Sequence, residues 1–146
     1  MGLWAWTLAV YDRPGVQDLL LGLQDEAGQS PPFLLWAAWA APVEDELLTR
    51  AAAFARAWED VATAPLRAAR RAMKARLAPI PDAGRETLRN QVKGVELASE
   101  RLLMETLEGL APAGGGDRLA ALQAAARAWG RPAPAESLAA LADALR

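Results

Sequence analysis

The chain has 146 residues, enough for one domain with a core of its own, since compact domains usually span about 100–200 residues. Hydrophobic residues make up 53% and charged residues 23%, a balance that excludes a disordered polyelectrolyte. The net charge of −2 is unevenly spread, because residues 1–46 carry −6 and residues 47–93 carry +6. Either the acidic and basic thirds compensate each other, or the basic third meets an external anionic partner.

The sequence contains neither cysteine nor histidine. Disulfides and thiolate metal sites are therefore excluded, and the usual acid/base group and metal ligand at neutral pH is missing. Catalysis would have to use carboxylates, Tyr11, hydroxyls or guanidinium groups. The composition thus favours a non-enzymatic protein with no cofactor and no metal site.

The first apolar stretch lacks a basic flank, and Asp12 and Arg13 follow it too soon for a signal peptide. No uncharged apolar stretch approaches the roughly 20 residues that a membrane-spanning helix needs. We therefore expect a cytoplasmic protein without a transmembrane segment. Nucleic acid is not an expected partner, because the pI of about 5.2 is far below the value above about 9 that is typical of such domains.

Apolar residues recur with helical spacing almost throughout, and nowhere alternate as in a half-buried strand. The first predicted helix covers 3–11 and ends before Pro14 and Gly15, and the second follows Pro14 and ends at Gly28. The third, 33–41, is apolar all round. A helix without a polar face is either the centre of a bundle or an interface with another chain.

The fourth predicted helix begins near Glu44 and continues, after a kink or a new first turn at Pro65, to Leu77. Two prolines at 79 and 81 then break the chain before a long helix, 82–110. We expect this helix to pack antiparallel on the fourth helix and its extension. The residues predicted to face inward on it are Leu88, Val92, Val95, Leu102 and Leu103.

Residues 111–116 are rich in glycine and predict a flexible linker. It separates a predicted bundle domain, 1–110, from a short Ala-rich helical tail, 117–146, packed on or beside the bundle. The predicted fold class is all-α, a compact bundle of about five helices plus this tail.

A resemblance to a known family rests on three sequence blocks that occur in order. They are LWAWTLAVYDRPGV from Leu3, APLRAARRAMK from Ala64 and LRNQVKGVELASER from Leu88. Together they are similar to a proteobacterial family of uncharacterised proteins, domain of unknown function 2390. The resemblance covers residues 3–108. It implies a helical fold in a bacterial cytoplasm and no particular activity.

Four cations share about a third of the circumference of one predicted helix. This basic stripe consists of Arg67, Arg70, Arg71 and Lys74. In one interpretation, Glu96, Glu100 and other acids neutralise it from the antiparallel long helix or the acidic first third. In the other, it binds a phosphate, an acidic peptide or an anionic lipid headgroup.

Two helix-to-loop junctions carry polar side chains, Tyr11 and Arg13 at one and Gln24 and Asp25 at the other. If the junctions meet, these four residues would line a polar pocket for a small ligand. Ordinary turn and capping chemistry is the alternative explanation.

Six tryptophans are many for this length, and helices 3–11 and 33–41 are too apolar for so small a bundle to be expected to cover them fully. Exposed aromatic patches mark partner surfaces, so Trp4, Trp36 and Trp39 are candidates for an apolar interface. The sequence therefore predicts a protein-interaction or regulatory module that binds a protein partner or self-associates. The alternative is a small-ligand or anion-binding module that uses the basic stripe.

Overall fold

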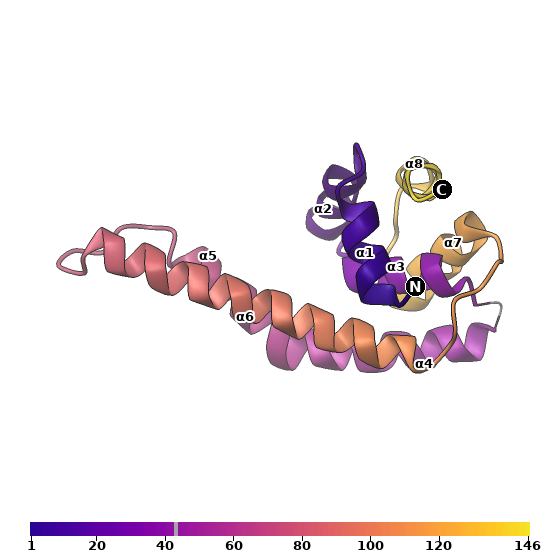
Figure 1. The fold of residues 1–146 in the computed structure, drawn as a ribbon, viewed down its shortest axis with the longest axis horizontal. Helices are drawn as coiled ribbons and strands as arrows, with labels where there is room; N and C mark the ends of the chain where they lie inside the picture. The colour runs from indigo at the N-terminus through magenta and orange to yellow at the C-terminus, as the bar shows by residue number, and fades with distance from the viewer. Residues whose placement is uncertain (43) are drawn as a thin grey trace. The chain divides into compact units, whose positions relative to one another are not determined.

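The structure is a computed structural model that describes residues 1–42 and 44–146. Throughout these residues the regular secondary structure is helical (Figure 1), which confirms the all-α class. None of the described helices is both long and apolar enough to cross a bilayer. The chain forms two compact units: unit 1 comprises Met1–Phe54 and Met104–Arg146, and unit 2 comprises Ala55–Leu103.

Unit 1 is built from the two ends of the chain. Its helices are α1 (Leu3–Tyr11), α2 (Val16–Asp25), α3 (Pro31–Ala40), most of α4 (Asp45–Trp58), the end of α6 (Asp82–Glu108), α7 (Arg118–Trp129) and α8 (Ala135–Ala144). The break between α1 and α2 falls at Gly15, whose φ of 83° lies in the left-handed region that glycine adopts without strain. Ser30 begins α3 by accepting a hydrogen bond from the backbone N–H of Phe33.

The centre of unit 1 is α3, in which every residue of 32–40 is buried. Phe33 and Trp36 are fully buried, and their ring centroids lie 5.7 Å apart. The helix ends at Ala41, a non-glycine residue with a φ of 44°. Of the two explanations for a helix without a polar face, the structure therefore shows the centre of a bundle.

Helices α7 and α8 contribute to the same core. α7 packs against α3, and α8 packs against α2 and α7. Leu122 and Leu141 are fully buried, and Arg13 donates a hydrogen bond of 2.6 Å to the main-chain oxygen of Arg146. The sequence predicts a domain boundary at 111–116, between a bundle that folds on its own and a helical tail. This boundary stays a prediction.

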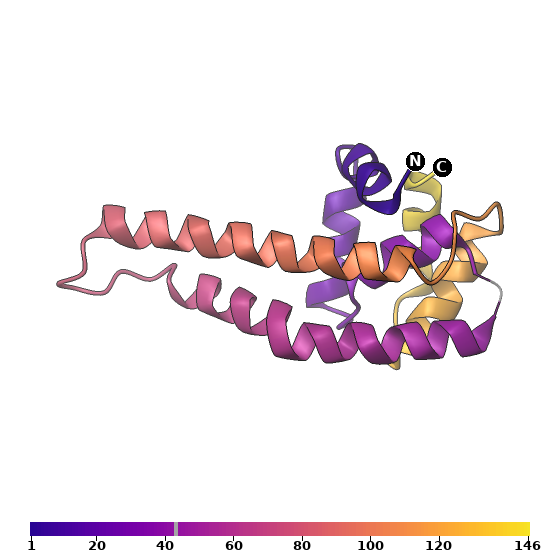
Figure 2. The same cartoon turned by 60° about the horizontal axis from the view of Figure 1, so that its bottom comes forward.

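Unit 2 is an antiparallel helical hairpin formed by the end of α4, the π-helix η1 (Glu59–Thr63), α5 (Ala64–Ala72) and most of α6. Hydrogen bonds join Thr63 to Ser99, Arg70 to Glu96 and Arg85 to the carbonyl of Met73. Residue numbers therefore increase along one helical arm of the hairpin as they decrease along the other, which makes the arms antiparallel. The two arms lie side by side in Figure 2.

The π-turn before α5 accommodates Pro65, which occupies the first turn of that helix. A proline lacks the N–H and collides with the carbonyl four residues earlier. In the wider turn the N–H of Ala64 bonds instead to the carbonyl of Glu59, five residues back. The new first turn expected at Pro65 is thus present, and it makes α4 and α5 separate helices. Six α-helices, α1–α6, consequently lie in the described residues before 110, so the prediction of about five was slightly low.

Candidate functional site

The face of α6 that contacts η1 and α5 is ionic rather than apolar. Glu96 is only 7% exposed and accepts hydrogen bonds from both Arg67 and Arg70. Arg67 also pairs with Glu59 at 2.8 Å and lies 3.7 Å from Glu100. The cluster therefore brings three carboxylates to two guanidinium groups.

Burial raises the pKa of Glu100 to about 7, because loss of water disfavours the charged carboxylate. The positive charges of Arg67 and Arg70 oppose this rise, whereas the negative charges of Glu96 and Glu59 add to it. For Arg67, burial lowers the pKa, but the hydrogen bond and charge of Glu59, with the charges of Glu100 and Glu96, outweigh it and leave the pKa raised. Arg67 thus remains the cationic centre of the cluster.

Polar contacts continue along the same face. The hydroxyls of Ser99 and Thr63 are 2.9 Å apart, and the indole N–H of Trp58 donates to the carbonyl of Ser99 at 3.0 Å. Within Ala55–Leu103, all of which is described, the buried residues are Ala55, Thr63, Glu96, Ser99 and Leu103. Buried apolar area provides most of the stabilisation of a fold. Because the hairpin buries so few apolar residues, it gains little stabilisation from apolar burial.

Three aliphatic residues of α6 lie on a different, exposed face. Leu88, Val95 and Leu102 are 52%, 54% and 52% exposed and follow one another at seven-residue intervals. Three more exposed, uncharged residues, Gly84, Gln91 and Ala98, lie on the same face. Together the six residues follow one another at alternating intervals of four and three. We call this set the α6 stripe: Gly84, Leu88, Gln91, Val95, Ala98 and Leu102.

This spacing is that of the a and d positions of a coiled coil, which form a narrow seam against another helix. The three large residues occupy a, and the three smaller or polar ones occupy d. Leu97, 53% exposed, lies on the same helix but outside the stripe.

The prediction that Leu88, Val95 and Leu102 face inward was wrong, whereas Leu103 is buried and Val92 is partly buried as expected. The physical reason lies in α5, which has no buried residue and offers α6 an arginine-rich surface. Glu96 and its partners occupy the inner face, so the aliphatic row is turned outward. Its seven-residue repeat, free of charged residues, was the signal in the sequence that could have identified it.

Two of the four cations of the basic stripe are neutralised within unit 2. Arg67 and Arg70 are engaged by Glu59, Glu96 and Glu100, as in the interpretation that assigned the counter-charge to the long helix. The remaining two members of the stripe, Arg71 and Lys74, are exposed. As a binding site for anions or a partner, the stripe stays a prediction.

The two polar junctions are separated by the length of α2. Tyr11 and Arg13 precede this helix, whereas Gln24 and Asp25 form its last turn, and Val16 and Gln24 are about 12 Å apart along the axis at 1.5 Å per residue. Arg13 instead holds the end of the chain through the carbonyls of Ala144 and Arg146. As a pocket for a small ligand, the four residues stay a prediction.

The tryptophans proposed for an interface lie mainly inside unit 1. Trp36 is 0% and Trp39 8% exposed, because α3 is covered on all sides, whereas Trp4 on α1 is partly buried. A partner could reach Trp36 only after unit 1 opened. The interface role of these three residues stays a prediction, and the burial of α3 does not favour it.

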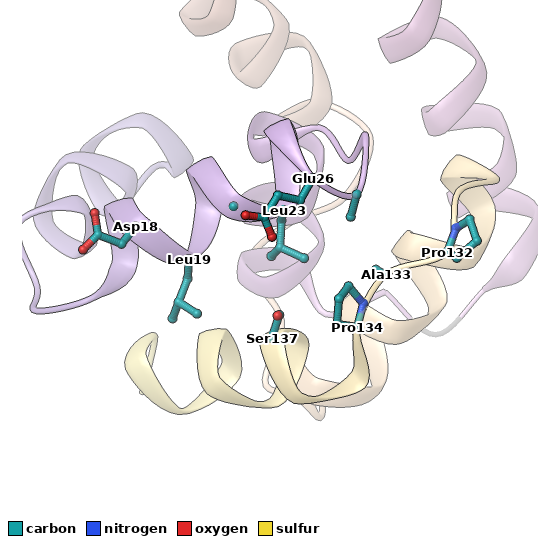
Figure 3. Close-up of a pocket in the computed structure, with 10 residues that line it drawn as sticks. Asp18, Leu19, Leu23, Glu26, Pro132, Ala133, Pro134 and Ser137 are labelled. Carbon is teal, nitrogen blue, oxygen red and sulfur yellow. The ribbon is translucent and has the colours of Figure 1, made fainter.

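A pocket of about 570 Å³ opens in unit 1 between α2 and the segment that leads into α8 (Figure 3). Leu19, Leu23 and Pro134 give it an apolar lining, and Asp18 and Glu26 are its charged residues. Two carboxylates make this pocket unsuitable for the anions that the basic stripe was predicted to bind. Among the described residues no group of three or more acidic side chains is placed to hold a metal ion.

The helices and the α6 stripe define an all-α protein with an exposed coiled-coil-like seam and an ionic hairpin. Over residues 2–107 the chain matches the family described as "Protein of unknown function (DUF2390)". It belongs to that family, which the resemblance over 3–108 had indicated. The match includes α1–α5 and the whole α6 stripe, and it leaves α7 and α8 outside. No curated protein and no solved structure matches the chain.

Proposed function

We propose that this protein is a protein-interaction module whose docking surface is the α6 stripe and whose occupant is a second copy of the chain. The observation that carries the proposal is the outward position of Leu88, Val95 and Leu102, each just over half exposed on one helix. Rows of exposed aliphatic residues at coiled-coil spacing are costly in water unless another helix covers them.

The hairpin itself supports this proposal. Its inner contact is an ion cluster around Arg67 and Glu96, and removing such charges from water offsets much of their mutual attraction. Covering the aliphatic stripe would add the apolar burial that unit 2 lacks. A second copy carries the same repeat of a and d positions, so it supplies a facing helix of matching period.

The test is the molar mass of the full chain in sedimentation or light scattering over a series of concentrations. Because the stripe is short, we expect a weak and reversible dimer at twice the 15.6 kDa of one chain. Val95→Gln places a polar group in the middle of the seam and should raise the dissociation constant by about tenfold or more, equivalent to about 1.4 kcal/mol.

Leu97→Gln is the matched control, because Leu97 is on the same helix with nearly the same exposure but outside the stripe. It should leave the dissociation constant within about twofold of the wild type. A chain that remains monomeric at every concentration, or two variants with equal effects, would contradict the proposal.

The alternative function, anion binding by the basic stripe, is less well supported. Two of its four cations, Arg67 and Arg70, already share Glu96, and an added phosphate would have to compete with that carboxylate. Titration of the chain with inorganic phosphate, followed by calorimetry, tests this alternative, and saturable binding that Arg71→Ala abolishes would favour it.

A further inference from the structure

We infer that the two copies pair through their α6 stripes in antiparallel orientation, with Leu88 of each chain against Ala98 of the other. This inference rests on the proposed function and adds the direction and register of the contact. It follows from the residue types along the stripe, because the a positions hold the branched aliphatic residues and the d positions hold glycine, glutamine and alanine.

In a parallel pair with matching register, identical positions face each other. Layers of Leu88 or Leu102 would then alternate with layers of Gly84 or Ala98. Two leucines push the helices apart, whereas two glycines fill no space, so a parallel pair leaves gaps at alternate layers. Such gaps are unfavourable because protein interfaces are packed as densely as interiors.

In an antiparallel pair, a positions face d positions. One register aligns every layer at once: Leu88 meets Ala98, Val95 meets Gln91, and Leu102 meets Gly84. Each large side chain then faces a smaller or flexible one, which is the arrangement that fills a seam evenly. No charged residue occupies any of these six positions, so neither copy places like charges in the contact.

Gln91 also fits this register. Its two copies lie four residues apart across the two-fold axis, about 6 Å along the helix direction, where their amides can reach each other. A polar residue within a seam costs stability but fixes the register of the pair. The weak, specific dimer of the proposed function is the expected result.

The absence of cysteine from the sequence makes disulfide mapping direct, since each single-cysteine variant carries one thiol. We would prepare Leu88→Cys and Ala98→Cys as full-length chains, oxidise each alone, and oxidise an equimolar mixture after exchange under reducing conditions. A disulfide requires Cα atoms within about 7 Å of each other. In the antiparallel register, the two Ala98 positions are ten residues apart, about 15 Å along the axis, so self cross-linking is excluded.

The expected result is a disulfide-linked dimer in the mixture, with the intact mass of one Leu88→Cys chain plus one Ala98→Cys chain, and none from either variant alone. Gly84→Cys with Leu102→Cys should behave the same way, and Leu97→Cys should cross-link with none of them. Efficient self cross-linking of each stripe variant would show a parallel pair and overturn the inference while leaving the proposed function intact.

Two further outcomes are equally decisive. A dimer by mass that forms none of these disulfides would overturn the inference, because its contact would lie elsewhere. A monomer by mass with stripe cysteines protected from alkylation would overturn both the inference and the proposed function, because the chain itself would cover the stripe.

Discussion

The ring of Trp129 on α7 lies 5.6 Å from the ring of Phe33 on α3, measured between centroids. The indole N–H of Trp129 also donates a 2.8 Å hydrogen bond to the carbonyl of Gly28, in the connection between α2 and α3. One side chain therefore ties α7 both to the central helix of unit 1 and to the loop that precedes it.

Trp129→Ala should destabilise the protein by about 3–5 kcal/mol, the usual cost of removing a buried aromatic residue. Trp129→Phe keeps much of the packing but leaves the carbonyl of Gly28 without this donor, so a loss of about 1–2 kcal/mol is expected. Urea unfolding monitored by circular dichroism measures both.

Arg127→Ala, an exposed position on the same helix, is the control and should stay within about 0.5 kcal/mol of the wild type. If Trp129→Ala had as small an effect as this control, α7 would not belong to the cooperative core of unit 1.

The glycines of the 111–116 segment are not equivalent, although the sequence suggested one uniform flexible linker. A β-carbon on Gly114 would collide with the carbonyl oxygen of Ala40, whereas one on Gly115 would meet nothing within 4 Å. Gly114→Ala should therefore cost about 1–3 kcal/mol, because backbone must move to relieve the contact. Gly115→Ala should be neutral or stabilising by up to about 1 kcal/mol, since it restricts the unfolded chain. Thermal unfolding of the two variants side by side checks this, and equal melting temperatures would contradict it.

Helix positions were readable from the sequence because their ends are marked by strong local signals. Gly15 precedes α2 and Pro31 begins α3, where backbone geometry favours these residues. Pro65 lies in the first turn of α5, which is one of the two alternatives expected there. For the all-apolar helix 33–41, the sequence left two alternatives open, the centre of a bundle and an interface. Only tertiary packing distinguishes them, and the structure shows the centre of a bundle.

The faces of α6 were not readable in the same way. Helical spacing of Leu88 and Val95 shows that they share a side, but the inward direction was assumed from their apolar character. In the structure, Glu96 and Arg67 occupy the inner side because the opposing arm presents arginines. The spacing of residues shows which side chains share a face of a helix. It does not show whether the ionic face or the aliphatic face contacts the neighbouring helix.

The candidate polar pocket would have to span the length of α2, and it stays a prediction. Arg13 and Gln24 flank the same helix, and a ten-residue α2 keeps its two ends apart whatever the rest of the chain does. The pairing of the basic stripe with Glu96, by contrast, follows from antiparallel neighbours and was one of the two interpretations open from the sequence.

Arg67 should be the most sensitive charged residue of the hairpin. Arg67→Met removes the partner shared by Glu59, Glu96 and Glu100 and leaves three carboxylates close together, so we expect a loss of about 2–3 kcal/mol. Lys74→Met, at an exposed position of the same stripe, should change the free energy of unfolding by less than about 0.5 kcal/mol. Urea unfolding at neutral pH measures both, and similar values would show that the cluster contributes little.

Glu100 should make stability depend on pH in a definite direction. Its pKa is about 7 in the folded protein against 4.5 as the ordinary value, so folding favours the protonated carboxyl. Its stabilising contribution is complete below about pH 4.5 and is lost as the pH rises through 7. Glu100→Gln, which mimics the protonated form, should be about as stable as the wild type at pH 5. At pH 8 it should be more stable, by an amount on the order of 1–3 kcal/mol.

Unfolding curves at a series of pH values between 5 and 8 provide the measurement, with the exposed Asp60→Asn as the control. A difference between Glu100→Gln and the wild type that stays constant across this range would show that Glu100 does not titrate there.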